Sequence, residues 1–107
     1  MKNASIGIFD SGIGGLTIAH SMQEKMPNES IIYFGDTKHL PYGEKSNSAI
    51  QDFSESITKF LLQQNCKAIV IACNSASSVA YKKVKEIAGI VPVFNVIDPI
   101  VNYVNKN

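Results

Sequence analysis

The sequence predicts an α/β fold with a parallel sheet, and three observations support this prediction. Short apolar runs that are typical of strands alternate with segments of helical periodicity four times along the chain. Strands separated by helices favour a parallel sheet with right-handed crossovers. The chain has 107 residues, of which 45% are hydrophobic and 18% are charged, as expected for one packed domain. We therefore expect a three-layer sandwich around a mostly parallel four-stranded sheet, with residues 1–107 forming one α/β domain.

The first half of the chain is predicted to hold two strands and two helices. Residues 5–9 form a strand that runs into a glycine-rich turn (DSGIGG), and a helix follows over residues 16–25. The second strand covers residues 31–34, and a loop of about ten residues follows it, a length that often carries function. The next helix begins near Ser46 or Ser48, where Ser48 and Gln51 fit a capping box. The residues expected on the buried faces of these helices are Ala19, Met22, Met26, Ile50, Phe53, Ile57, Phe60, Leu61 and Gln64.

The second half repeats the alternation. A strand over residues 68–72 leads into a helix over residues 75–87, and Gly89 is a typical C-terminal stop for that helix. A fourth strand covers residues 93–96, and residues 100–107 have the pattern of a further helix. The residues expected on the buried face of the helix over 75–87 are Ala76, Val79, Ala80, Val84 and Ile87.

Cys73 stands at a predicted strand-to-helix junction. The apolar run before it suits a strand covered on both faces, and Asn74, Ser75 and Ser77 after it are good helix N-cap residues. A cysteine at a helix N-terminus lies near free backbone N–H groups and the positive end of the helix dipole, which favour the thiolate. The spacing alone leaves two interpretations open: an activated thiol, or a buried structural cysteine beside a helix cap.

The other cysteine, Cys66, is predicted to be a small apolar filler at the entrance of the same strand. The extended residues between Cys66 and Cys73 separate them by about 15–20 Å. A disulfide needs Cα atoms within about 7 Å, so the two cannot bridge. Their spacing does not fit a metal site, and no histidine lies near them in the sequence, so we expect no metal.

Composition and charge argue against several classes of partner. The formal net charge is +1, from 10 basic and 9 acidic residues, and no basic run appears, so nothing points to nucleic acid. The apolar segment before Asp10 is too short for a signal peptide or a membrane span. We therefore expect a cytoplasmic protein with no membrane contact.

The chemistry-bearing residues fall at the predicted carboxyl ends of the strands, where ligands bind in open parallel sheets. A dinucleotide site is disfavoured, because Thr17 replaces the third glycine of the fingerprint and Asp10 brings a charge to the pyrophosphate position. A cysteine nucleophile needs a histidine nearby, but His20 falls on a helix surface and His39 in a solvated loop. A third possibility is that Cys73 acts as acid or base at a carbon atom, with Asp10 binding a substrate ammonium or influencing the protonation of the thiol.

Three motifs stand out in order along the chain: IGIFDSGIGGLT (residues 6–17), YFGDTKHLPYGEKS (residues 33–46) and VIACNSAS (residues 70–77). Together they resemble the N-terminal half of glutamate racemases, within the aspartate/glutamate racemase superfamily, and the similarity continues through VPVFNVIDP (residues 91–99). The combination of YFGDTKHLPYG with DSGIGG favours glutamate racemase over the aspartate and hydantoin relatives. The resemblance covers almost the whole chain.

The resemblance implies a cofactor-free, two-base racemisation of L-glutamate to D-glutamate for peptidoglycan synthesis. One cysteine removes the α-proton and a second, on the opposite face of the substrate, supplies the new one. Cys73 matches the first cysteine, and Asp10 matches a substrate-binding position from which it also assists the proton transfer. The other positions that match substrate-binding residues are Ser11, Pro41, Tyr42, Gly43, Asn74 and Ser75, where Ser75 replaces the usual threonine of the family.

The chain departs from the family in length. Members are about twice as long and have two similar α/β domains around a central cleft, and the second cysteine with its neighbouring histidine belongs to the other half. The resemblance therefore implies that these 107 residues are one lobe of a two-domain racemase, inactive alone and prone to self-association. The alternative hypothesis is a non-catalytic lobe on the same scaffold that binds an amino acid or another protein. The role of Asp36, as a loop cap or as a catalytic group, stays open.

Overall fold

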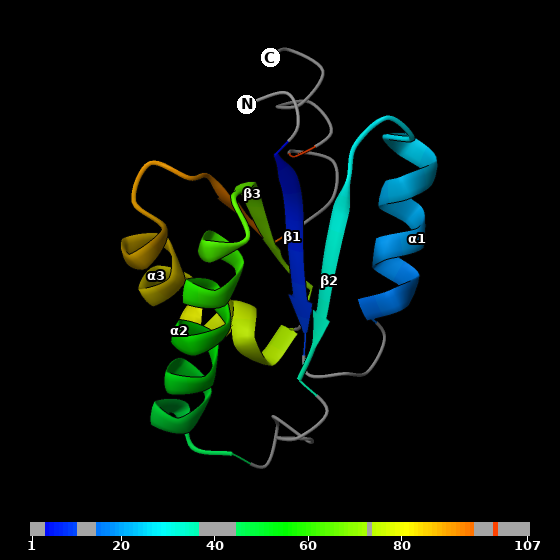
Figure 1. Cartoon of the computed structure of the whole chain (residues 1–107). Helices are drawn as coiled ribbons and strands as arrows, with labels where there is room; N and C mark the ends of the chain where they lie inside the picture. Colours follow the sequence, from blue (N-terminus) through cyan, green and yellow to red (C-terminus); the bar gives the residue numbers. More distant parts are fainter. Residues whose placement is uncertain (1–3, 11–14, 37–44, 73, 96–99, 101–107) are drawn as a thin grey trace.

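The computed structural model describes residues 4–10, 15–36, 45–72, 74–95 and 100, and it confirms the predicted α/β fold (Figure 1). All strand pairings are parallel, in the order β2-β1-β3-β4. Helix α1 covers one face of this sheet, and helices α2 and α3 cover the other, which gives the three predicted layers. The bounds are β1 Ser5–Asp10, α1 Gly15–Lys25, β2 Ile31–Gly35, α2 Asn47–Gln63, β3 Cys66–Ile71, α3 Asn74–Ala88 and β4 Val93–Phe94.

The core on the α1 face follows the alternation of the strands. Ile6 and Ile8 of β1 point to this face with Ala68 and Val70 of β3, and all four are buried. Helix α1 covers them with the predicted stripe of Ala19, Met22 and Met26, and Ile100 completes the cluster. The stripe on α1 is therefore confirmed, and His20 is exposed on its other side as predicted.

The core on the opposite face is larger. Phe9 of β1 and Ile69 and Ile71 of β3 pack under helices α2 and α3. The prediction for α2 was partly wrong, because Phe60 is 40% exposed and Gln64 is exposed, while Ser54 and Thr58 are fully buried. The reason is that α2 packs against α3 as well as the sheet, so its buried face is rotated toward α3. The buried residues of α2 and α3 in this cluster are Ile50, Ile57, Leu61, Ala76, Ala80, Val84 and Ala88.

Helix α2 is capped by Ser46, so the predicted capping box of Ser48 and Gln51 is wrong. The Oγ of Ser46 accepts a hydrogen bond from the Ala49 backbone N–H at 3.1 Å. Gln51 instead lies within the helix, where its Nε2 donates to the Val79 carbonyl oxygen of α3 at 3.2 Å. A tertiary contact with α3 therefore takes the side chain that the local pattern assigned to a cap.

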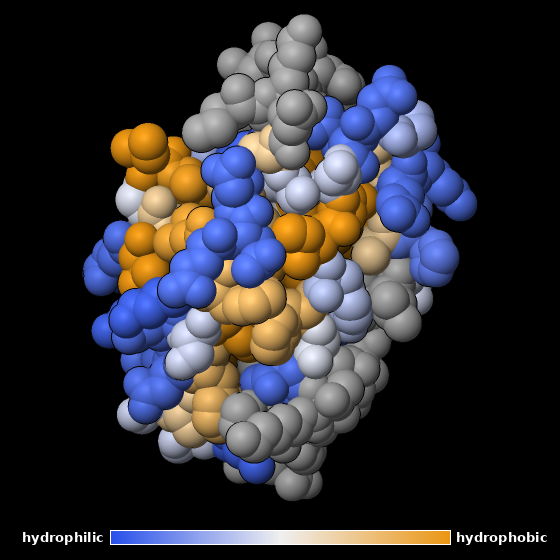
Figure 2. Space-filling view, in the orientation of Figure 1, coloured by the Kyte–Doolittle hydropathy of each residue, from blue (hydrophilic) through white to orange (hydrophobic). Residues whose placement is uncertain are grey.

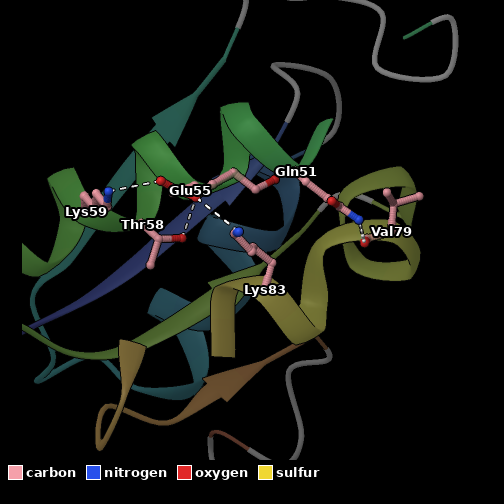
Figure 3. Close-up of polar contacts among 7 residues, drawn as sticks. Gln51, Glu55, Thr58, Lys59, Val79 and Lys83 are labelled. Carbon is pink, nitrogen blue, oxygen red and sulfur yellow. Dashed lines mark hydrogen bonds and ion pairs between the residues drawn. The ribbon is translucent and has the colours of Figure 1, made fainter. Parts of the chain in front are cut away.

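Polar contacts link the outer parts of α2 and α3 (Figure 3). Glu55 of α2 accepts from Lys59 at 3.0 Å within its own helix and pairs with Lys83 of α3 at 3.5 Å. The hydrogen bond from Lys59 is the main reason that the pKa of Glu55 is lowered from its usual value. Deeper between the helices, the Thr58 hydroxyl donates to the Ser54 carbonyl oxygen at 2.7 Å. Exposed ion pairs add little stability, so the buried apolar contacts hold these helices together.

Each of the two long helices on this face is followed, within two residues of its end, by a residue with positive φ. Asn65 follows α2 with φ 62°, and Gly89 follows α3 with φ 63°. Glycine adopts this conformation without strain, and asparagine tolerates it better than most other residues. The predicted stop at Gly89 is confirmed. Strand β4 is shorter than predicted, ending at Phe94, and the predicted residue Val96 and the helix over residues 100–107 lie outside the described residues, apart from Ile100.

Strand β3 starts two residues earlier and ends one residue earlier than predicted, and it contains an irregularity near its start. Ser5 pairs with Cys66, but Ile6 pairs with Ala68, so Lys67 is an extra residue in β3. This shift turns Cys66 toward the α2 face, where it is buried beside Gly7 and Leu61. The predicted role of Cys66 as an apolar filler is confirmed, and burial raises the pKa of its thiol.

Gly7→Ala should destabilise the fold by about 1–3 kcal/mol, the usual cost of overpacking a core. A Cβ at Gly7 would lie 3.0 Å from the Cys66 Sγ and 3.1 Å from the Leu61 Cδ1. Urea denaturation followed by circular dichroism measures the loss. The second substitution Cys66→Ala should recover part of it, since it removes the closer of the two contacts. An unchanged unfolding midpoint for Gly7→Ala would show that the core has room there.

Some apolar surface remains on the α2 side of the sheet. Figure 2 shows hydrophobic residues between the polar outer side of α2 and strand β2. The Phe34 ring of β2 and the Phe60 ring of α2 meet here, with centroids 5.6 Å apart and a tilt of 60°. None of the helices in the described part of the chain combines the length and apolar character needed to cross a bilayer.

Candidate functional site

The carboxyl ends of β1, β2 and β3 are joined by backbone hydrogen bonds. Strand β1 lies between the other two, and its last residue, Asp10, accepts a hydrogen bond at its carbonyl oxygen from the Asp36 N–H at 3.0 Å. On the other side, the Ala72 N–H donates to the Phe9 carbonyl oxygen at 2.8 Å. These ends point toward the lower edge of the view in Figure 1. The sequence predicted that the carboxyl ends of these strands lie together at one edge of the sheet. The structure confirms this for the residues of the edge that it describes.

Asp10 is the one predicted catalytic residue whose side chain the structure describes. Its exposed fraction is 0%, and one carboxylate oxygen, Oδ1, accepts a hydrogen bond from the Tyr33 Oη at 2.8 Å. The alternation of β1 places Asp10 on the α1 face, two residues beyond Ile8. A buried carboxylate is costly unless it is hydrogen-bonded, so the Tyr33 hydroxyl contributes to holding Asp10 in this position.

Tyr33 belongs to the site geometry, although the sequence reasoning treated it only as a strand residue. It lies on the α1 face of β2, and its ring extends over Gly35, the residue paired with Asp10 across the two strands. Burial first, and then its contact with Asp10, raise the pKa of Tyr33 from 10.0 to about 12. The sequence could have indicated this role through the alternation of β2 together with a parallel pairing of β1 and β2. That pairing places positions 33 and 35 beside Asp10.

The raised pKa makes this contact sensitive to strongly alkaline conditions. The folded state holds the Tyr33 proton more tightly than the unfolded chain, whose tyrosine pKa is close to 10. The contribution of this group to stability is therefore complete below about pH 10 and is lost as pH rises through about 12. Near neutral pH, Tyr33 stays protonated and acts as a hydrogen-bond donor.

The junction around position 73 has the predicted strand-to-helix form. Strand β3 ends at Ile71 and helix α3 begins at Asn74, so the N-terminus of α3 follows the carboxyl end of β3 after two residues. The free N–H groups of a helix N-terminus attract anions such as a thiolate or a carboxylate. The predicted succession of a strand and a helix is therefore confirmed, and the start of α3 follows the same end of β3 that is bonded to β1.

Several predicted site residues lie outside the described residues. They are Ser11, Pro41, Tyr42, Gly43 and Cys73, together with His39 and Asp98, and the side chains of Asn74 and Ser75 are likewise not described. Asp36 is described and is buried, with its backbone N–H bound to Asp10. Among the described residues, Asp10, Tyr33 and Asp36 are thus brought to one edge of the sheet.

Within the described ranges, no group of three or more histidine, cysteine, aspartate or glutamate side chains is arranged to hold a metal ion. Cys66 lies at the first residue of β3, at the end of the strand away from Asp10 and the start of α3. It is a free, buried thiol that lies away from the edge formed by Asp10, Tyr33 and Asp36.

Comparison with known proteins identifies relatives that share both sequence and fold. The chain is 52% identical over 96 residues to a glutamate racemase of Neisseria meningitidis. The aligned region covers 90% of this chain and 36% of that protein. The crystal structure of Francisella tularensis glutamate racemase in complex with D-glutamate matches with a TM-score of 0.84 and 53% identity, over 87% of this chain and 35% of that one. Thermus thermophilus glutamate racemase in complex with β-chloro-D-alanine matches with a TM-score of 0.83 and 47% identity, over 92% of this chain and 38% of that one.

The match is confined to one part of each relative. The chain spans little more than a third of the length of these glutamate racemases, and it corresponds to their N-terminal part. No protein-family model matches the sequence.

Proposed function

We propose that this chain, a homologue of the N-terminal part of glutamate racemases, is one lobe of a cofactor-independent glutamate racemase. In this proposal the complete enzyme converts L-glutamate to D-glutamate in the cytoplasm, and the product serves peptidoglycan synthesis, and so the cell wall and cell shape. The observation that carries the proposal is the edge of the sheet where buried Asp10 lies beside the carboxyl end of β3, with α3 beginning after two intervening residues. It is supported by the 52% identity over 96 residues to a glutamate racemase.

The proposed chemistry is proton transfer at the α-carbon of glutamate. Cys73 is one of two bases, and the N-terminus of α3 supports its thiolate form. Asp10 binds the substrate ammonium and assists the transfer. Ser11, Asn74 and Ser75 hold the substrate carboxylates, and the loop of Pro41, Tyr42 and Gly43 contacts the substrate. The second base comes from another part of the enzyme, beyond the 107 residues.

Because this proposal assigns the two bases to different parts of the enzyme, the 107 residues alone do not racemise glutamate. A single base cannot both remove the α-proton from one face and deliver a proton to the other. The residues form an N-terminal domain that needs a second domain to close the site. Apolar surface such as the half-exposed Phe60 favours contact with that domain or, without it, self-association.

Incubation with L-glutamate in heavy water tests the proposal. We compare the 107-residue chain with a fusion of this chain to the C-terminal part of the Francisella tularensis relative, hereafter the completed enzyme. The completed enzyme should form D-glutamate with deuterium at the α-carbon, while the chain alone should form none. Full racemisation by the 107 residues alone would contradict the single-base assignment. A folded completed enzyme that neither racemises nor exchanges the α-proton would contradict the racemase proposal.

A further inference from the structure

We propose that Tyr33 is a positioning residue that fixes the orientation of the Asp10 carboxylate in the glutamate site, and that Gly35 provides the space for it to do so. This inference rests on the proposed function, because the orientation of Asp10 matters only if Asp10 acts on a substrate. It adds two residues of β2 to a site assigned so far to strand ends and loops. Neither residue is expected to touch the substrate.

The hydroxyl of Tyr33 has a specific target. It donates to the Asp10 Oδ1 at 2.8 Å, a short contact typical of a charge-assisted hydrogen bond. Holding one carboxylate oxygen restricts rotation about the terminal bond of the aspartate side chain, which otherwise has a broad torsional preference. The backbone of Asp10 is held from the same strand segment, through the Asp36 N–H. Both parts of Asp10 are therefore fixed by β2 and its first following residue.

The glycine opposite Asp10 explains how the ring reaches this position. Tyr33 and Gly35 lie on the same face of β2, and Gly35 is the residue that pairs with Asp10. A Cβ at position 35 would lie 2.8 Å from the Tyr33 Oη and 3.2 Å from the ring carbons Cε2 and Cζ. The ring therefore lies over a residue without a side chain, and any larger residue would displace the hydroxyl from Asp10.

Packing alone does not account for the hydroxyl. The Tyr33 ring packs against the α1-face cluster of Ile6, Ile8 and Met22, a role that phenylalanine fills equally well. Burial of the hydroxyl is costly without a partner, and Asp10 provides that partner. The raised pKa of Tyr33 keeps the donor protonated over the neutral range, which agrees with a fixed donor and not with an acid that transfers protons.

The test separates a positioning role from a purely structural one in the completed enzyme. Tyr33→Phe removes the hydroxyl, and Gly35→Ala displaces it while keeping it. Each should lower kcat about tenfold with KM for glutamate within about threefold, since misplacement of a catalytic group costs up to about a hundredfold. Replacing Tyr33 with 4-aminophenylalanine, which keeps a donor at the ring tip, should restore most of kcat. Tyr81→Phe is the matched control, because its hydroxyl donates at 3.3 Å to the Val93 carbonyl oxygen, away from Asp10.

A double-variant cycle decides whether Tyr33 works through Asp10. In an Asp10→Asn background, Tyr33→Phe should lower kcat no further. A full additional tenfold loss in that background would overturn the inference, as would an unchanged kcat for Tyr33→Phe. An inactive but folded completed enzyme without substitutions would instead overturn the proposed function, and this inference with it.

Discussion

Replacing Cys73 with serine in the completed enzyme should lower the rate of glutamate racemisation by about 10²–10⁴-fold, the usual contribution of a positioned acid or base. A serine hydroxyl is far less acidic than a thiol, so it cannot serve as the base near neutral pH. Chiral chromatography of the glutamate product measures the rate. Because serine is nearly the same size as cysteine, the unfolding midpoint should change little.

Cys66→Ser is the matched control for this experiment. Cys66 is the other cysteine of the chain, and it lies at the opposite end of β3, buried against Gly7 and Leu61. Its substitution should leave kcat unchanged, with any loss appearing in stability. Unchanged turnover in the Cys73→Ser enzyme would favour the alternative of a lobe that binds an amino acid without catalysing its reaction.

The largest effect on stability is expected for Phe9→Ala, at about 3–5 kcal/mol. Phe9 is fully buried in the inner strand β1, where its ring packs in the core beneath helices α2 and α3. Folded domains are stable by about 5–15 kcal/mol in total, so this loss should remove much or most of the stability of the 107-residue chain. Urea denaturation followed by far-ultraviolet circular dichroism measures it.

Phe60→Ala gives the comparison for Phe9→Ala. Phe60 is 40% exposed and contacts Phe34 at the rim of the same core, so its truncation leaves no closed cavity. The expected cost is about 0.5–1.5 kcal/mol, from the lost aromatic pair. Equal losses for the two variants would show that the core is not centred on Phe9.

The features that were predicted correctly from the sequence are those that depend on the pattern of apolar and polar residues close together along the chain. The alternation of apolar runs and helical stripes predicted the strands and helices to within about two residues at most ends, and the run before Cys73 predicted the junction of β3 and α3. The position of Asp10 at a strand end followed from the same pattern. These features depend on neighbours along the chain, which the sequence displays directly.

The features that the sequence did not predict depend on contacts between distant segments. The hydrogen bond between Tyr33 and Asp10 joins residues 23 positions apart, and it requires the pairing of β1 with β2. The true role of Gln51 required α3 to pack beside α2, and the irregularity at Lys67 required the pairing of β1 with β3. Local propensity offers several choices at such positions, and tertiary packing selects among them.

The order of the strands also sets the order in which the fold can assemble during synthesis. The inner strand β1 is made first, yet its partner on one side, β3, follows about sixty residues later, since Ser5 pairs with Cys66. At about 5–20 residues per second, the ribosome exposes β1 for several seconds before β3 is available. During that interval β1 has only the elements made before β3 to cover its apolar residues, namely α1, β2 and α2, and its edge facing β3 stays unpaired. The sheet can therefore be completed only after the third strand emerges, and folding should be slow for the length of the chain, as is usual for parallel sheets with distant partners.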